Sequence, residues 1–60
     1  MTAHSQIQQD VLDFCTEPRS REEIHSALSH PDEVIRHVVR ELLYEGKMTT
    51  TPDWEYETVQ

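Results

Sequence analysis

The sequence predicts a small α+β fold, mostly α-helical, in which three helices precede a C-terminal β-hairpin. Three stretches place apolar residues three and four positions apart, which is the repeat of an amphipathic helix. Prolines separate these stretches, and after Gly46 the composition changes to one typical of β-strands. With 60 residues the chain has room for one domain, which we expect to span residues 1–60.

The first helix is predicted over residues 5–15. Ser5 is expected to act as its N-cap, because a serine hydroxyl can accept a hydrogen bond from the first turn. Pro18 disfavours helical geometry at the residue before it, so the helix should end upstream. One helical face carries the apolar side chains Ile7, Val11, Phe14 and Cys15.

The second helix is predicted over residues 20–28. Ser20 and Glu23 match a capping box, in which each side chain satisfies a backbone N–H of the other residue. The apolar stripe that follows consists of Ile24, Ala27 and Leu28.

The third helix, over residues 31–45, has the strongest helical pattern. Pro31 suits the first turn, where its missing N–H costs nothing, and Gly46 is a favourable C-terminal stop. About half of the helical wheel is apolar: Val34, Ile35, Val38, Val39, Leu42 and Leu43. The opposite line carries Glu33, His37, Arg40 and Tyr44, with Arg36 beside it.

Residues 47–59 are predicted to form a β-hairpin whose turn lies near Pro52, Asp53 and Trp54. Threonine, valine and aromatic residues flank this turn, as is typical of short strands. Met48, Trp54 and Tyr56 are expected to face the core. Since a two-stranded hairpin is not stable alone, it should pack against the helices.

The net charge of −7, from twelve acids and five bases, opposes simple electrostatic attraction to nucleic acids or anionic membranes. The charge is unevenly distributed. Residues 1–18 and 48–60 each carry three acids and no Lys or Arg, whereas residues 19–47 carry all five bases and six acids. The central segment is therefore close to neutral.

The order of these elements resembles a winged helix-turn-helix domain, and the best match runs from Ile24 to Met48. The spacing that carries the resemblance comprises Ile24, Ala27, Leu28, Ile35, Val39, Leu42, Gly46 and Met48. The polar segment before Trp54 resembles the wing of that family. The resemblance implies a sequence-specific DNA-binding protein that regulates transcription, with the third helix in the major groove and the wing on the backbone.

The DNA-binding residues that this placement implies are Arg21, Arg36, His37, Arg40, Lys47, Thr49 and Thr50. Arg36 and Arg40 could each donate two hydrogen bonds to guanine or phosphate. In the simpler alternative they are solvated, or paired with Glu33, Glu41 or Glu45. Few positive charges imply modest affinity per chain, so a homodimer on double-stranded DNA is expected.

A second functional class stays open, because acids share the third helix with the arginines. The chain could be an acidic protein-interaction module, or a nucleic-acid mimic that binds a protein partner and no DNA. The excess of carboxylates also suits a high-salt cytoplasm, where they keep proteins soluble.

Other functions are not expected from the residues present. No apolar run is long enough to span a membrane, and no signal peptide is apparent, so we expect a cytoplasmic protein. No constellation of nucleophile and base indicates an enzyme, and no cofactor motif occurs. The four histidines show no metal-ligand spacing, so no metal site is predicted, and Cys15 is expected to be a small core residue.

Overall fold

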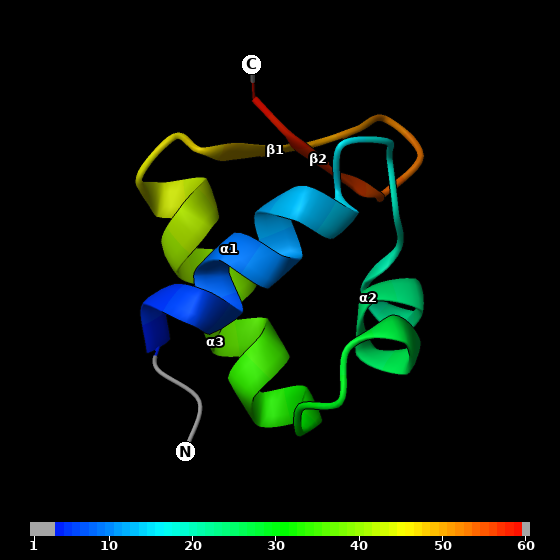
Figure 1. The fold of residues 1–60 in the computed structure, drawn as a ribbon. Coiled ribbons are helices and arrows are strands. Elements are labelled where there is room, and N and C mark those ends of the chain that lie inside the picture. Colours follow the sequence, from blue (N-terminus) through cyan, green and yellow to red (C-terminus); the bar gives the residue numbers. More distant parts are fainter. Residues whose placement is uncertain (1–3, 60) are drawn as a thin grey trace.

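The computed structural model describes residues 4–59, in which three helices precede a two-stranded antiparallel sheet (Figure 1). The elements are α1 (His4–Phe14), α2 (Arg21–Ala27), α3 (Asp32–Tyr44), β1 (Met48–Thr50) and β2 (Tyr56–Thr58). Every predicted helix boundary lies within one residue of the observed one. The predicted α+β class, with three helices and a C-terminal hairpin in the winged-helix arrangement, is confirmed.

The core lies where α1, α2 and α3 meet beneath the sheet, and α3 contributes the most side chains to it. Its buried members are Ile7, Val11, Cys15, Ile24, Ile35, Val38, Val39, Leu42 and Met48. All of them come from the apolar stripes and strand positions predicted above. Because burying an aliphatic side chain contributes about 1.5–3 kcal/mol, these contacts are the main attraction holding the elements together.

Local hydrogen bonds fix the ends of α2 and α3. The Glu23 N–H donates to Ser20 Oγ at 3.1 Å and the Ser20 N–H donates to Glu23 Oε1 at 3.1 Å, which confirms the capping box. At the end of α3, Gly46 adopts φ +77° and its N–H donates to the Leu43 carbonyl at 3.1 Å. The Lys47 N–H donates to the Leu42 carbonyl at 2.9 Å, which completes a Schellman motif.

The sheet includes a pairing that the sequence pattern does not reveal. β1 and β2 pair from Met48 opposite Thr58 to Thr50 opposite Tyr56. Arg19, in the segment between α1 and α2, joins the other edge of β2. The Arg19 N–H donates to the Tyr56 carbonyl at 2.9 Å, and the Tyr56 N–H donates to the Arg19 carbonyl at 2.7 Å. β2 therefore connects the hairpin to the first half of the chain.

Three details of the sequence prediction are wrong. Ser5 is not an N-cap, because α1 begins at His4 and Ser5 lies inside it. Ala27 is exposed, since α2 ends there and turns only Ile24 and Leu28 toward the core. Trp54 is 83% exposed, because its N–H donates to the Thr51 carbonyl in the turn and its φ of +63° directs the side chain away from the core.

Candidate nucleic-acid interface

The exposed side of α3 has two chemically different flanks. Its inner side is fixed by the four buried residues Ile35, Val38, Val39 and Leu42. At 100° per residue, Arg36 lies on the flank next to Val39, whereas Glu41 and Glu45 lie on the opposite flank. Arg40 and His37 lie between these flanks, and both are exposed. The helix therefore separates Arg36 from Glu41 and Glu45, whereas Arg40 borders the same surface as these two acids.

All three predicted DNA-binding arginines converge on one hollow, which we call the arginine pocket. It has a volume of about 260 Å³ and is lined by Arg21, Arg36, Val39, Arg40, Leu43 and Tyr56. Arg21 comes from the first turn of α2, two arginines come from α3, and Tyr56 comes from β2. The helix-turn-helix packing thus brings together cations that are 15 and 19 residues apart in the sequence.

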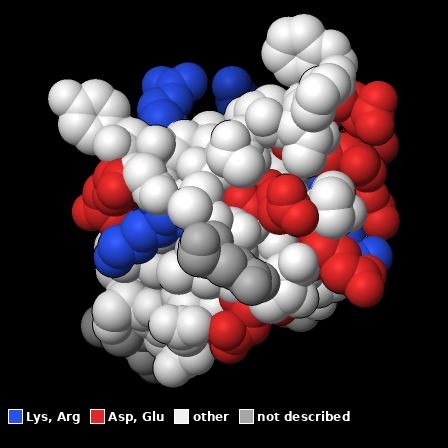
Figure 2. Space-filling model, turned by 90° about the horizontal axis from the view of Figure 1, so that it is seen from above, with Lys and Arg blue, Asp and Glu red and all other residues white. Residues whose placement is uncertain are grey.

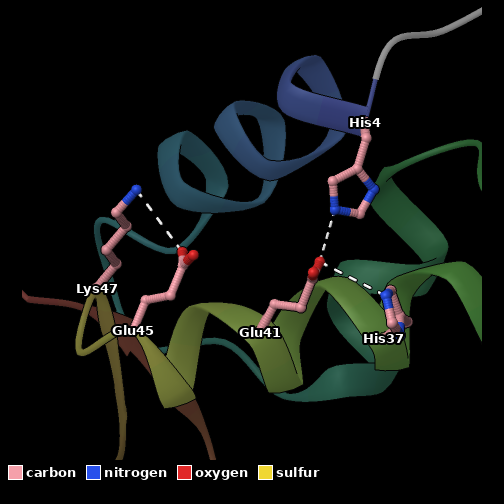
Figure 3. Close-up of polar contacts among 5 residues, drawn as sticks. All are labelled: His4, His37, Glu41, Glu45 and Lys47. Carbon is pink, nitrogen blue, oxygen red and sulfur yellow. Dashed lines mark hydrogen bonds and ion pairs between the residues drawn. The ribbon is translucent and has the colours of Figure 1, made fainter.

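The three arginines of this pocket have no acidic partner among residues 4–59. The ion pairs of that region involve other groups: Glu41 lies near His4 and His37, and Glu45 lies 3.7 Å from Lys47 (Figure 3). The alternative of ion-paired α3 arginines is therefore excluded: neither Arg36 nor Arg40 pairs with Glu33, Glu41 or Glu45. The three arginines are exposed and therefore accessible to an anionic ligand.

The remaining arginine is part of the framework. The Arg19 guanidinium lies 4.9 Å from the centre of the Phe14 ring, and it is 3.5 Å from Glu17 and 3.8 Å from Glu23. With its backbone paired to β2, Arg19 connects the end of α1 to α2 and the sheet. The Arg19 charge therefore interacts with groups of the protein itself.

The predicted wing residues are exposed but lie outside the arginine pocket. Lys47 follows the end of α3 and pairs with Glu45, so part of its charge is already balanced. Thr49 and Thr50 are exposed on β1. Figure 2 shows that, on the face seen from above the sheet, acidic side chains are numerous and basic ones lie toward the edges.

Two aromatic residues that were predicted to face the core line the candidate site: Tyr56, which does pack against the core, and Trp54, which does not. Tyr56 is half-buried and lines the arginine pocket. Trp54 and Tyr56 also line a neighbouring hollow together with Ser20, Arg21 and Glu22. The position of Trp54 directly after Pro52 and Asp53 is a signal for a turn tip, where an aromatic side chain is solvent-facing. Two acids add negative charge at the margin of the site. Glu22 lines the hollow that contains Trp54, and Glu33 lies beside the α3 arginines.

Cys15 is excluded from the candidate site by its burial. Its side chain is fully buried in the core, and burial raises the pKa of the Cys15 thiol to about 11 although the Arg19 charge acts in the opposite direction. A thiol with this pKa stays protonated near neutral pH and is a poor nucleophile or metal ligand. The expectation that Cys15 is a small core residue is confirmed.

Searches against models of protein families, curated proteins and solved structures find no match for this chain. Within residues 4–59, no helix has the length and apolar character needed to cross a membrane. The functional assignment therefore depends on the geometry of the chain itself.

Proposed function

We propose that this protein binds double-stranded DNA in a sequence-specific manner and regulates transcription, with α3 in the major groove and the hairpin as a wing on the backbone. The observation that supports the proposal is the arginine pocket. Three exposed guanidinium groups from α2 and α3 lie together and have no carboxylate partner among the described residues. Arginine forks of this kind suit guanine edges and phosphate oxygens.

The proposed roles follow from position. Arg36 and Arg40 project from the exposed side of α3, so they are assigned to base edges and adjacent phosphates, with His37 beside them. Arg21 lies at the start of α2, where a phosphate contact fixes orientation without reading sequence. Thr49, Thr50 and Lys47 are assigned to the backbone as members of the wing, and the exposed Trp54 extends the wing tip.

The acidic surface limits the affinity of a single chain. A net charge of −7 reduces long-range attraction to DNA, and Glu33 lies in the same hollow as Arg36, His37 and Arg40. Three or four charge-assisted contacts per chain are few for a specific complex. Binding as a homodimer doubles the contacts, so we propose a dimer on a site with two-fold symmetry.

The experiment is a selection from random duplex DNA at low salt, followed by an NMR titration of the full chain with the selected duplex. We expect backbone shifts over residues 32–44 and 47–53. The double substitution Arg36→Ala with Arg40→Ala should abolish binding while leaving the circular dichroism spectrum unchanged, and His25→Ala, which changes an exposed residue of α2, should bind as the wild type does. Failure to enrich any duplex would remove the proposal.

A second candidate is an acidic protein-interaction module. Acidic side chains are more abundant than basic ones on the face seen from above (Figure 2), and Tyr44 is 94% exposed at the end of α3. Exposed aromatic residues are enriched at protein interfaces. This function predicts a protein captured from lysate whose binding is lost when Tyr44 and the neighbouring Glu45 are changed. It also predicts that the Arg36→Ala, Arg40→Ala variant retains that protein.

A further inference from the structure

Two histidines and one glutamate from α1 and α3 meet at the exposed side of α3 (Figure 3). His4 lies at the first turn of α1, and His37 and Glu41 lie one turn apart on α3. We propose that His4, His37 and Glu41 bind a divalent transition-metal ion of the zinc type. The proposal concerns a site separate from the arginine pocket and does not depend on DNA binding.

The ligand atoms already lie close to a coordinating arrangement. His4 Nε2 is 2.6 Å and His37 Nε2 is 3.7 Å from Glu41 Oε1, and the three ligand atoms all lie within 4.8 Å of one another. Zinc–ligand bonds of about 2.0–2.2 Å in a tetrahedron place neighbouring ligand atoms about 3.4 Å apart. Small rotations of exposed side chains are therefore sufficient, and the backbone need not move.

The chemistry of the three groups selects the class of ion. Two imidazoles and one carboxylate suit zinc and cobalt(II), whereas magnesium and calcium prefer oxygen ligands alone. Three protein ligands on an exposed surface leave the fourth position to water. The overall charge of −7 favours a cation, although Arg40, which borders the same surface as His37 and Glu41, opposes it locally.

The fold supplies the rigidity that such a site needs. Ile7 and Val11 of α1 pack with Ile35, Val38 and Leu42 of α3 in the core, so the two helices that carry the ligands have a fixed separation. His37 and Glu41 are four residues apart on one helix and therefore project from the same side. The His4 and His37 rings lie 6.0 Å apart at 58°, so both edges can turn toward a common point.

An ion at this site would crosslink α1 and α3 through two histidines that are 33 positions apart in the chain. In the unfolded chain these ligands are far apart, so the ion binds the folded state more tightly and stabilises it. Without an ion, Glu41 contacts both histidines itself. That contact keeps the three side chains together and positions them for exchange with a cation.

The test is a calorimetric titration of the full chain with zinc chloride, with NMR to locate the ion. We expect one zinc ion per chain, with shifts centred on His4, His37 and Glu41. Because removing even a supporting residue of a metal site weakens binding by about 10–100-fold, His4→Ala and Glu41→Gln should each weaken zinc binding by about tenfold or more. The matched control, His25→Ala, removes a histidine of α2 and should leave zinc affinity unchanged.

A second measurement separates this site from loose histidine binding. A saturating zinc concentration should raise the melting temperature of the wild type and the His25→Ala protein by about 5 °C or more. The His4→Ala protein, whose change lies at the exposed start of α1, should show no such rise. The proposal is overturned if the wild type does not bind zinc at millimolar concentration, or if His25→Ala weakens binding as much as His4→Ala does.

Discussion

The number of free arginines in the pocket sets the salt dependence of DNA binding, and Arg40→Gln tests it. Each phosphate that a cation neutralises releases counterions, so the logarithm of affinity falls with the logarithm of salt concentration by about 0.9 per contact. Arg21, Arg36 and Arg40 have no carboxylate partner among residues 4–59, so each can neutralise one phosphate, whereas the Lys47 charge is balanced by Glu45 and is not counted. The expected slope per bound chain is therefore about −2.7.

The slope gives the expected change in DNA affinity. Raising KCl from about 50 to about 200 mM is a fourfold increase, and four to the power 2.7 is about 40, so wild-type affinity should fall about 40-fold. Arg40→Gln leaves two contacts and a slope of about −1.8, so the same increase should lower the affinity of this variant only about 12-fold. Fluorescence anisotropy of a labelled duplex across a KCl series measures both slopes.

The matched control is Arg19→Gln, which changes the net charge by the same amount. Arg19 is already engaged by Phe14, Glu17 and Glu23, so its removal should leave the slope at the wild-type value. The reasoning is refuted if Arg40→Gln keeps the wild-type slope, or if Arg19→Gln flattens the slope equally. Circular dichroism of both variants confirms that they remain folded.

Three further outcomes concern stability. Since the folded pKa of Cys15 is about 11 and the ordinary value is 9.0, folded protein holds this proton between pH 9 and 11 whereas unfolded protein loses it. The free energy of unfolding of the wild type, measured in urea, should therefore fall by about 2–3 kcal/mol over that pH range relative to the Cys15→Ala variant. Parallel pH curves for the two proteins would contradict this. Ser20→Ala removes the acceptor for the Glu23 N–H and should lower the free energy of thermal unfolding by about 1 kcal/mol. The control Ser26→Ala, inside α2, should not lower it. Equal effects of the two substitutions would show that the cap does not contribute. Because KCl screens repulsion among excess carboxylates, the melting temperature should rise with KCl, and a flat or falling curve would show that this repulsion is unimportant.

Local interactions made the helices predictable. The stripes of α1 and α3 repeat within the helices themselves, and the Ser20–Glu23 box and the Gly46 stop each involve residues that are close in sequence. Patterns of this kind are determined before tertiary packing contributes. The same reasoning placed Arg36 and Arg40 on the exposed side of α3, since the apolar half of the wheel fixes which half remains outside.

Features that depend on distant pairing were not predictable. The Thr58 hydroxyl donates to the Leu12 carbonyl at 2.7 Å across 46 residues, and no local pattern indicates that β2 lies against the end of α1. The bridge between Arg19 and Tyr56 is likewise long-range, and it explains why Arg19 is structural while Arg21 is exposed. Trp54 was misplaced because its hydrophobicity favours burial, whereas the turn geometry determines its direction.

His37 belongs to both proposed surfaces, so zinc and DNA should influence each other. An ion would occupy His37 Nε2 and remove a hydrogen bond to DNA, which is worth about 0.5–1.5 kcal/mol. It would also add two positive charges, and at about 10 Å in water these attract one phosphate by about 0.8 kcal/mol before screening. The two effects nearly cancel in affinity, but they differ in kind: hydrogen bonds to bases carry specificity, whereas charge attracts any duplex.

Zinc should therefore bring the dissociation constants of a selected and an unrelated duplex closer together. By linkage, each duplex must change the affinity of the protein for zinc by the same factor by which zinc changes the affinity of the protein for that duplex. Equal effects of zinc on the two duplexes would show that His37 does not read sequence.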